Sequence, residues 1–211
     1  HPVIKAVAFT GSRSAGVALM KTAAARPEPI PVFAEMSSIN PVFLLPGVLS
    51  ERAAQVASGF VASLTMGAGQ FCTNPGLVIG LKSPELDTFL QAATEHVKSA
   101  DSATMLTPGI YSAYEEGVTH LKGQANARLL AEGKLNESLS NQCQARLFAT
   151  EAEAFIKAPH DLGREVFGSS SLLVVCDNED QMVEVIDALE GQLTATLQMT
   201  DADAALAKRL I

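Results

Sequence analysis

Short apolar runs rich in β-forming residues alternate along the chain with alanine-rich or amphipathic segments. The apolar runs predict strands at residues 4–10, 32–35, 42–45, 77–81, 146–149, 172–176 and 193–199. The other segments predict helices at 14–25, from an N-cap at Ser50 to about 65, at 84–99, over most of 110–135, at 179–189 and at 201–211. This alternation indicates an α/β fold, in which helices flank an open, largely parallel twisted sheet.

Three closely spaced prolines, Pro27, Pro29 and Pro31, break the first helical segment and predict an extended connector. The sequence starts at His1 close to a strand-like run. It stops at Ile211 within a helical run that has no Gly, Asn or Pro to end it. We therefore expect a fragment of a longer protein, with a processed whole domain as the alternative.

Composition and charge narrow the class of function. The chain is 47% hydrophobic and 18% charged, which excludes a disordered polypeptide. The net charge is −8, with five basic and three acidic side chains in residues 1–80 against ten and twenty in residues 81–211. Neither part has the excess of Lys and Arg that nucleic acid phosphates require. No apolar stretch reaches the roughly 18 residues of a membrane span. We therefore expect neither nucleic acid nor a membrane as a partner.

The three cysteines differ in their sequence surroundings. An odd number without short-range pairing indicates free thiols in a reducing compartment, so we expect a cytoplasmic protein. Cys72 lies in a loop between Gly69 and Gly76, whereas Cys143 follows a polar Asn-Gln and Cys176 ends an apolar strand. We interpret Cys143 and Cys176 as structural. Because a thiolate attacks carbonyl carbon readily, Cys72 is a candidate nucleophile, although this pattern alone leaves a non-catalytic loop thiol open.

Two glutamates and one turn are weaker candidates. Glu35 ends a short apolar strand, where desolvation would suit a general base, and a solvated loop acid is the alternative. Glu165 alone is typical of an ordinary charge at the end of an element. Residues 11–16 follow a strand and open a helix, where backbone N–H groups can meet a phosphate, but they do not match GxGxxG. The acidic pair at 115 and 116 is interpreted as a solvated face. The four histidines lack metal-ligand spacing, so we expect no metal site.

Taken in order, four segments resemble the aldehyde dehydrogenase superfamily. They are Phe9-Thr10-Gly11-Ser12, Glu35 ahead of Asn40-Pro41, Gly69-Gln70-Phe71-Cys72-Thr73, and Glu165-Val166-Phe167-Gly168. The resemblance implies that Cys72 is the catalytic nucleophile and Glu35 the general base. It also implies a cofactor site, with Thr10, Gly11 and Ser12 on the cofactor side and with Glu165 and Phe167 at the nicotinamide ribose and ring. There are two departures: Ser37-Ser38-Ile39 replaces the family's Gly-Gly-Lys, and Ser169 replaces its Pro after Glu-x-Phe-Gly.

The resemblance implies a mechanism and a division of the chain. The thiolate would capture an aldehyde as a thiohemiacetal, NADP or NAD would accept the hydride, and Glu35 would activate water to hydrolyse the thioester. Residues 1–36 would be the last piece of a cofactor-binding domain, and residues 37–211 most of a catalytic domain. The family's oxyanion asparagine and ribose-binding lysine lie upstream, so we expect no turnover from the isolated fragment. A homo-oligomer, a dimer or tetramer in the parent, is also implied.

The finer resemblance concerns the substrate. Residues 35–46 and the segment Cys72-Thr73-Asn74-Pro75-Gly76 are most similar to the branch that oxidises α-ketoglutaric semialdehyde, or 2,5-dioxovalerate. NADP-dependent oxidation of fatty aldehydes is the alternative within the superfamily. A cofactor-independent thiol esterase and a non-catalytic assembly domain are alternatives outside it. Because a semialdehyde that carries a carboxylate calls for a basic group near the pocket mouth, Arg146 and Arg164 are candidates for that role.

Overall fold

A computed structural model describes residues 1–211, which form two compact units, His1–Ser38 and Ile39–Ile211. Each unit is described by itself. The sequence-based division after residue 36 falls two residues before this boundary.

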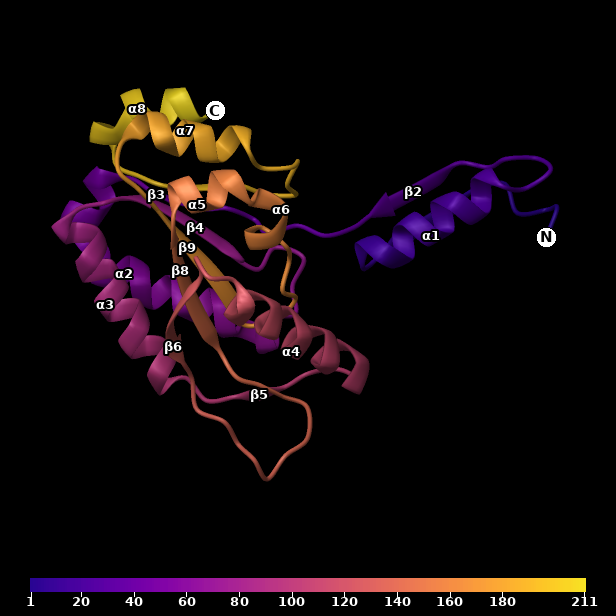
Figure 1. Cartoon of the computed structure of the whole chain (residues 1–211), viewed down its shortest axis with the longest axis horizontal. Helices are drawn as coiled ribbons and strands as arrows, with labels where there is room; N and C mark the ends of the chain where they lie inside the picture. The colour runs from indigo at the N-terminus through magenta and orange to yellow at the C-terminus, as the bar shows by residue number, and fades with distance from the viewer. The chain divides into compact units, whose positions relative to one another are not determined.

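The first unit is a strand, a helix and a parallel strand (Figure 1). It comprises β1 (Val7–Thr10), α1 (Arg13–Ala24) and β2 (Val32–Glu35). The two strands run parallel in a register that pairs Thr10 with Glu35. The Ser12 hydroxyl caps α1 by accepting a hydrogen bond of 3.4 Å from the N–H of Ala15. The first strand is three residues shorter than predicted, because pairing with β2 starts only at Val7.

The second unit is built on a six-stranded sheet with the strand order β10-β3-β4-β9-β8-β6. Its strands are β3 (Val42–Leu44), β4 (Leu77–Leu81), β6 (Arg128–Glu132), β8 (Arg146–Glu151), β9 (Ser170–Cys176) and β10 (Thr196–Gln198). All neighbours are parallel except β6 and β8, so the predicted open and largely parallel sheet is confirmed. A separate two-stranded ribbon pairs β5 (Ala103–Thr104) with β7 (Gln142–Cys143).

Helices cover both faces of this sheet (Figure 1). One face packs against α2 (Pro46–Thr65) and α3 (Pro84–Ser99), and its core includes Val78 and Leu173 from adjacent strands. The other face packs against α4 (Pro108–Gly123), α5 (Ala152–Lys157), α6 (Pro159–Leu162), α7 (Glu179–Asp187) and α8 (Ala204–Leu210). Two short 3₁₀ turns are η1 (Met66–Gly69) and η2 (Asp201–Asp203). Successive strand residues point to opposite faces, which explains why the long apolar runs fill two cores.

Two predicted helices differ from the observed ones by several residues. The second long helix begins at Pro46, not after Ser50, because the carboxylate of buried Asp203 accepts a 2.7 Å hydrogen bond from the N–H of Gly47. The segment predicted as mostly helical over 110–135 leaves the helix at Gly123 and becomes strand β6, which pairs antiparallel with β8. In both cases a partner distant in the sequence decides the local structure. No helix combines the length and apolar character needed to cross a bilayer.

Candidate active site

Cys72 lies in a turn that follows an unusual stretch of left-handed backbone. Gly67, Ala68 and Gly69 have φ angles of 56°, 59° and 68°. A Cβ at Gly69 would lie 2.2 Å from the carbonyl carbon of Gly168, so this position requires glycine for both its dihedral and its close approach. The Cys72 side chain is exposed to solvent. The loop predicted from the bracketing glycines is present, and it presents a thiol rather than burying one.

The other two thiols are buried. Burial raises the pKa of Cys176 to about 12, with smaller contributions from the charges of Asp177 and Glu151. The sulfur of Cys143 accepts a hydrogen bond of 3.4 Å from the backbone N–H of Ser169. Among the three cysteines, only Cys72 is open to an incoming carbonyl compound.

The Cys72 loop is bonded directly to the segment 165–168. The side-chain amide of Asn74 donates a 2.8 Å hydrogen bond to the carbonyl oxygen of Gly168. The other amide atom, Oδ1 of Asn74, is buried without a hydrogen-bond partner in the protein. Glu165 is half-buried and Phe167 is 37% exposed, so both remain accessible beside the loop. The structure therefore brings together two of the four segments on which the family resemblance depends.

Behind Gly168 lies a fully buried aromatic ring. A Cβ on Gly168 would lie 2.3 Å from Cδ2 of Tyr114, and the residue has a φ of +151°. The Tyr114 hydroxyl donates to the carbonyl oxygens of Gln144, at 2.6 Å, and Ser169, at 3.3 Å. The pKa of Tyr114 lies well above its ordinary value, first because of burial and then because of Cys143, with Arg146 opposing both. The Tyr114 ring therefore packs against Gly168 and restricts the movement of the segment that carries Phe167.

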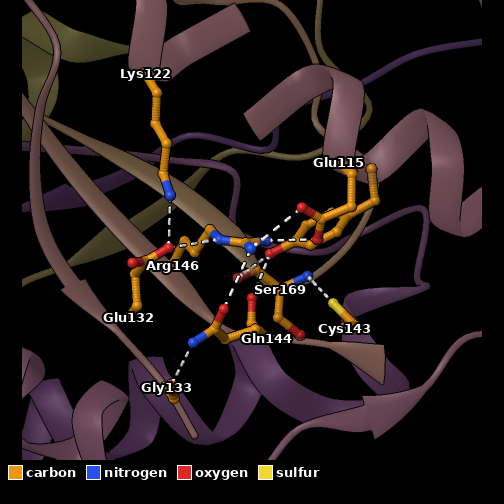
Figure 2. Close-up of polar contacts among 9 residues, drawn as sticks. Glu115, Lys122, Glu132, Gly133, Cys143, Gln144, Arg146 and Ser169 are labelled. Atoms are coloured by element: carbon orange, nitrogen blue, oxygen red, sulfur yellow. Dashed lines mark hydrogen bonds and ion pairs between the residues drawn. The ribbon is translucent and has the colours of Figure 1, made fainter. Parts of the chain in front are cut away.

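Arg146 is the centre of a polar network that includes Glu115, Glu132 and Gln144 (Figure 2). The guanidinium donates two hydrogen bonds to Glu115, of 2.8 and 3.2 Å, and one to Glu132 at 3.0 Å. It also donates to Gln144 and lies 5.4 Å from the centroid of the Tyr114 ring. Burial opposes its charge, but the bonds to the two carboxylates hold the pKa of Arg146 above its ordinary value.

This network corrects two interpretations made from the sequence. Arg146 is not placed to receive a substrate carboxylate, because its side chain is only 8% exposed and already donates four hydrogen bonds to protein acceptors. Glu115 is not part of a solvated face, since it binds this arginine, whereas Glu116 is exposed. Arg164, the other predicted candidate, is exposed.

The first unit gathers the remaining predicted residues at the carboxyl end of its two strands. The N–H of Gly11 donates a 3.1 Å hydrogen bond to the carbonyl oxygen of Glu35, so the candidate base lies beside the turn 10–12. The Glu35 side chain is exposed, which differs from the desolvation expected at the end of an apolar strand. Glu35 belongs to the first unit and Cys72 to the second.

The turn between β1 and α1 has the features that a phosphate-bearing cofactor requires. Thr10, Gly11 and Ser12 are all exposed, and the first turn of α1 contains no acidic residue. The turn leads directly into the N-terminus of α1, whose end carries the positive partial charge of the helix dipole. A Cβ at Gly11 would lie 2.7 Å from the Phe9 ring, which would have to move to admit it. An exposed turn without acidic residues at a helix N-terminus is compatible with an anionic group of a cofactor.

A pocket of about 350 Å³ lies between α2 and the strands β3 and β10. Thr73 and Pro75 of the Cys72 loop line it, but Cys72 does not. No cluster of three or more His, Cys, Asp or Glu side chains is arranged to hold a metal ion.

Comparison with known proteins identifies the family of this chain. The model of the aldehyde dehydrogenase family matches residues 1–209. The chain belongs to the aldehyde dehydrogenase family. Within this family it is 48% identical to alpha-ketoglutaric semialdehyde dehydrogenase 2 of Azospirillum brasilense and 41% identical to alpha-ketoglutaric semialdehyde dehydrogenase of Acinetobacter baylyi. Both alignments cover all of this chain and 40% of the relative, so the chain spans less than half the length of the curated dehydrogenases that it matches.

Solved aldehyde dehydrogenases share the fold. A NAD-dependent benzaldehyde dehydrogenase from Corynebacterium glutamicum superimposes with a TM-score of 0.79 at 21% identity, covering 100% of this chain and 46% of that one. A 1-pyrroline-5-carboxylate dehydrogenase superimposes with a TM-score of 0.80 at 16% identity, covering 99% and 41%. The predicted family and fold class are thus confirmed.

Two asparagines with prominent roles in the geometry were not predicted as functional. Asn74 was noted only within a motif, and Asn40 only as a neighbour of Pro41. Both bond to partners at least 32 residues away, so no local spacing could have identified them.

Proposed function

We propose that the whole protein containing this chain oxidises an aldehyde to a carboxylic acid with NADP or NAD, and that its substrate is α-ketoglutaric semialdehyde. The observation that carries this proposal is the exposed thiol of Cys72, held in a glycine-shaped loop that is bonded to the segment 165–168. The 48% identity to a dehydrogenase named for this substrate supports the choice of aldehyde.

In this mechanism Cys72 is the nucleophile. Its thiolate sulfur forms a bond to the carbonyl carbon, and the carbonyl electron pair moves to oxygen, where the backbone N–H of Cys72 stabilises the oxyanion. NADP or NAD, when bound, supplies the hydride acceptor. Loss of hydride from carbon leaves the acyl group on sulfur as a thioester.

Glu35 acts in the second half of the reaction. Its carboxylate takes a proton from water, whose oxygen attacks the acyl carbon. The carbon–sulfur bond then breaks, and the acid leaves while Cys72 recovers its thiolate. The exposure of Glu35 leaves it accessible to water.

Five residues would hold the cofactor. Thr10, Gly11 and Ser12 would bind it at the end of β1, and Glu165 and Phe167 would position its nicotinamide ribose and ring. Residues 1–36 then belong to a cofactor-binding domain and residues 37–211 to the catalytic domain. The whole enzyme is proposed to be a cytoplasmic dimer or tetramer.

A specific observation favours fatty aldehydes as the second candidate substrate. Phe71, next to Cys72, is 47% exposed and Leu106 is 81% exposed. The side-chain oxygen of Gln70 accepts a 2.9 Å hydrogen bond from the N–H of Leu106, which holds this leucine near the thiol loop. Apolar side chains placed in this way would suit a hydrocarbon tail.

The test is a substrate panel on the whole protein with NADP⁺ and with NAD⁺. We expect the highest kcat/KM with α-ketoglutaric semialdehyde and the loss of this activity in Cys72→Ser and Glu35→Gln, while Glu28→Gln, an exposed glutamate of the same unit, retains it. A preference for long-chain aldehydes would favour the second candidate. Ester hydrolysis without nicotinamide and without any aldehyde oxidation would replace the proposal with a thiol esterase.

A further inference from the structure

Asn40 binds the backbone of the Cys72 loop through its side chain. The amide nitrogen Nδ2 donates to the carbonyl oxygens of Cys72 and Asn74, each at 2.9 Å. The amide oxygen Oδ1 accepts a 3.1 Å hydrogen bond from the hydroxyl of Thr194. Asn40 is only 4% exposed, so these bonds form away from water. An amide group supplies two donor hydrogens, and both are used here on one loop.

The backbone at this position supports the same loop. Asn40 has a φ of +46°, a conformation that asparagine adopts more readily than most residues. The carbonyl oxygen of Ile39 accepts hydrogen bonds from the N–H groups of Gly76 and Leu77, at 2.9 and 3.1 Å. The chain at 39–40 therefore binds the loop at residues 72, 74, 76 and 77, from the reactive residue to the start of β4.

We propose that Asn40 is a positioning residue for Cys72, a role that rests on the proposed function of this thiol as nucleophile. The bond to the Cys72 carbonyl oxygen fixes the peptide plane that follows the cysteine, and the bond to the Asn74 carbonyl oxygen fixes a second plane two residues later. Because both peptide planes are held, the Cys72 thiol keeps a fixed orientation while its side chain stays exposed to solvent. Asn40 itself does not contact the reacting atoms in this scheme, because it acts through the loop backbone.

The variant Asn40→Gly in the whole protein distinguishes the effect of the side-chain amide from the effect of the backbone conformation. Glycine accepts a positive φ, so the substitution removes the side-chain bonds without imposing dihedral strain. Asn141→Gly is the matched control, because Asn141 also has a positive φ of 54° and lies outside the loop. Thr194→Val is a milder second variant, since it removes only the hydroxyl that orients the Asn40 amide.

Two readouts distinguish positioning from a general structural role. We expect Asn40→Gly to lower kcat by about 10- to 100-fold, because a small misplacement of a reacting group has effects of this size, with KM for the cofactor nearly unchanged. We expect alkylation of Cys72 by iodoacetamide to slow by about threefold or more, and Thr194→Val to shift both quantities less in the same direction. Asn141→Gly should change neither, even if it lowers Tm.

The proposal is overturned if Asn40→Gly and Thr194→Val alkylate at the wild-type rate, or if Asn141→Gly reproduces the loss of kcat. Should Asn40→Gly fail to fold, Thr194→Val decides alone by the same criteria. Alkylation needs no substrate, so it reports on Asn40 even if the whole protein oxidises no aldehyde. A failure of the proposed function and a failure of this inference are therefore distinguishable.

Discussion

Two regions of the second unit meet near Gly168, the Cys72 loop and the Arg146 network. They differ in whether their functional groups are exposed to solvent or bonded within the protein. On one side, the Cys72 loop exposes its reactive side chain and bonds its backbone through amide groups, including that of Asn74. On the other side, the buried guanidinium of Arg146 is held by the half-buried side chains of Glu115, Glu132 and Gln144.

The difference shows how stability and reactivity are divided between neighbouring segments. A nucleophile must meet its substrate, so its side chain cannot be immobilised by partners of its own. Its loop is instead fixed from behind, at a glycine that packs against the Tyr114 ring. Arg146 and its partners take no part in the reaction in this scheme. We interpret their network as a rigid support for the segment 165–168. The next three predictions perturb the loop, the Arg146 network and the contact between them.

The largest effect is expected from Cys72→Ser. A hydroxyl ionises far less readily than a thiol, so aldehyde oxidation by the whole protein should fall by about a thousandfold or more. Steady-state NAD(P)H formation measures the change. The control is Cys176→Ala, which removes a buried thiol on β9 and should retain activity. Equal losses in both variants would show that the exposed cysteine has no special role.

The second prediction is that Arg146→Ala disrupts the polar network that supports the segment 165–168. This substitution removes a buried guanidinium from two half-buried carboxylates and an aromatic ring, and we expect it to lower the free energy of unfolding by about 1.5–3 kcal/mol. The matched control is Arg209→Ala, because Arg209 also pairs with two acidic residues, Glu179 and Asp180, but at the surface. Exposed pairs of this kind contribute little to stability, because water and salt screen them. Urea unfolding measures both, and similar losses would contradict the contrast between buried and exposed charge.

The contact between the two regions is tested by Gly69→Ala. The new Cβ would meet the backbone of Gly168 at 2.2 Å, and neither side can rotate away as a side chain would. We expect kcat to fall by about 100-fold through displacement of the loop. Gly59→Ala, on α2, is the control because a Cβ there meets nothing within 4 Å and alanine favours a helix. Wild-type turnover in Gly69→Ala would show that the loop does not depend on this contact.

Elements whose signals are local were predictable from the sequence. The helix predicted at 84–99 is observed with these limits, and the Ser83 hydroxyl before it accepts a 3.1 Å hydrogen bond from the N–H of Leu86. The strand 77–81 was predicted with its observed limits, because an uninterrupted apolar run suits a strand that is buried on both faces. The short helices α5 and α6 and the ribbon of β5 with β7 gave no comparable signal and were not predicted.

The candidate site divides in the same way. The glycines around Cys72 indicated an exposed loop thiol without any partner being known. The hydrogen bonds from the side-chain amides of Asn40 and Asn74 that shape the loop could not be predicted, because they join residues separated by 32, 34 and 94 positions. The role of Arg146 was misjudged for a related reason. A basic residue at the start of a strand looks available until the fold brings Glu115 and Glu132 to it.

The smallest effect, about 1.4 kcal/mol by roughly pH 9.5, concerns a buried thiol at alkaline pH. Burial first, and then Asp177 and Glu151, raise the pKa of Cys176 to about 12 in the folded state, against roughly 8.5 in an unfolded chain. Its stabilising contribution is therefore complete below about pH 8.5 and is lost as the pH rises toward the folded pKa, because the unfolded chain ionises first. Between these values the free energy of unfolding should fall by up to about 1.4 kcal/mol per pH unit. Cys176→Ala lacks this component, whereas ionisation of Tyr114 affects both proteins equally. Urea unfolding from pH 8 upward should show the difference between wild type and variant shrinking steadily, and a constant difference would mean that this thiol ionises as freely in the fold as outside it.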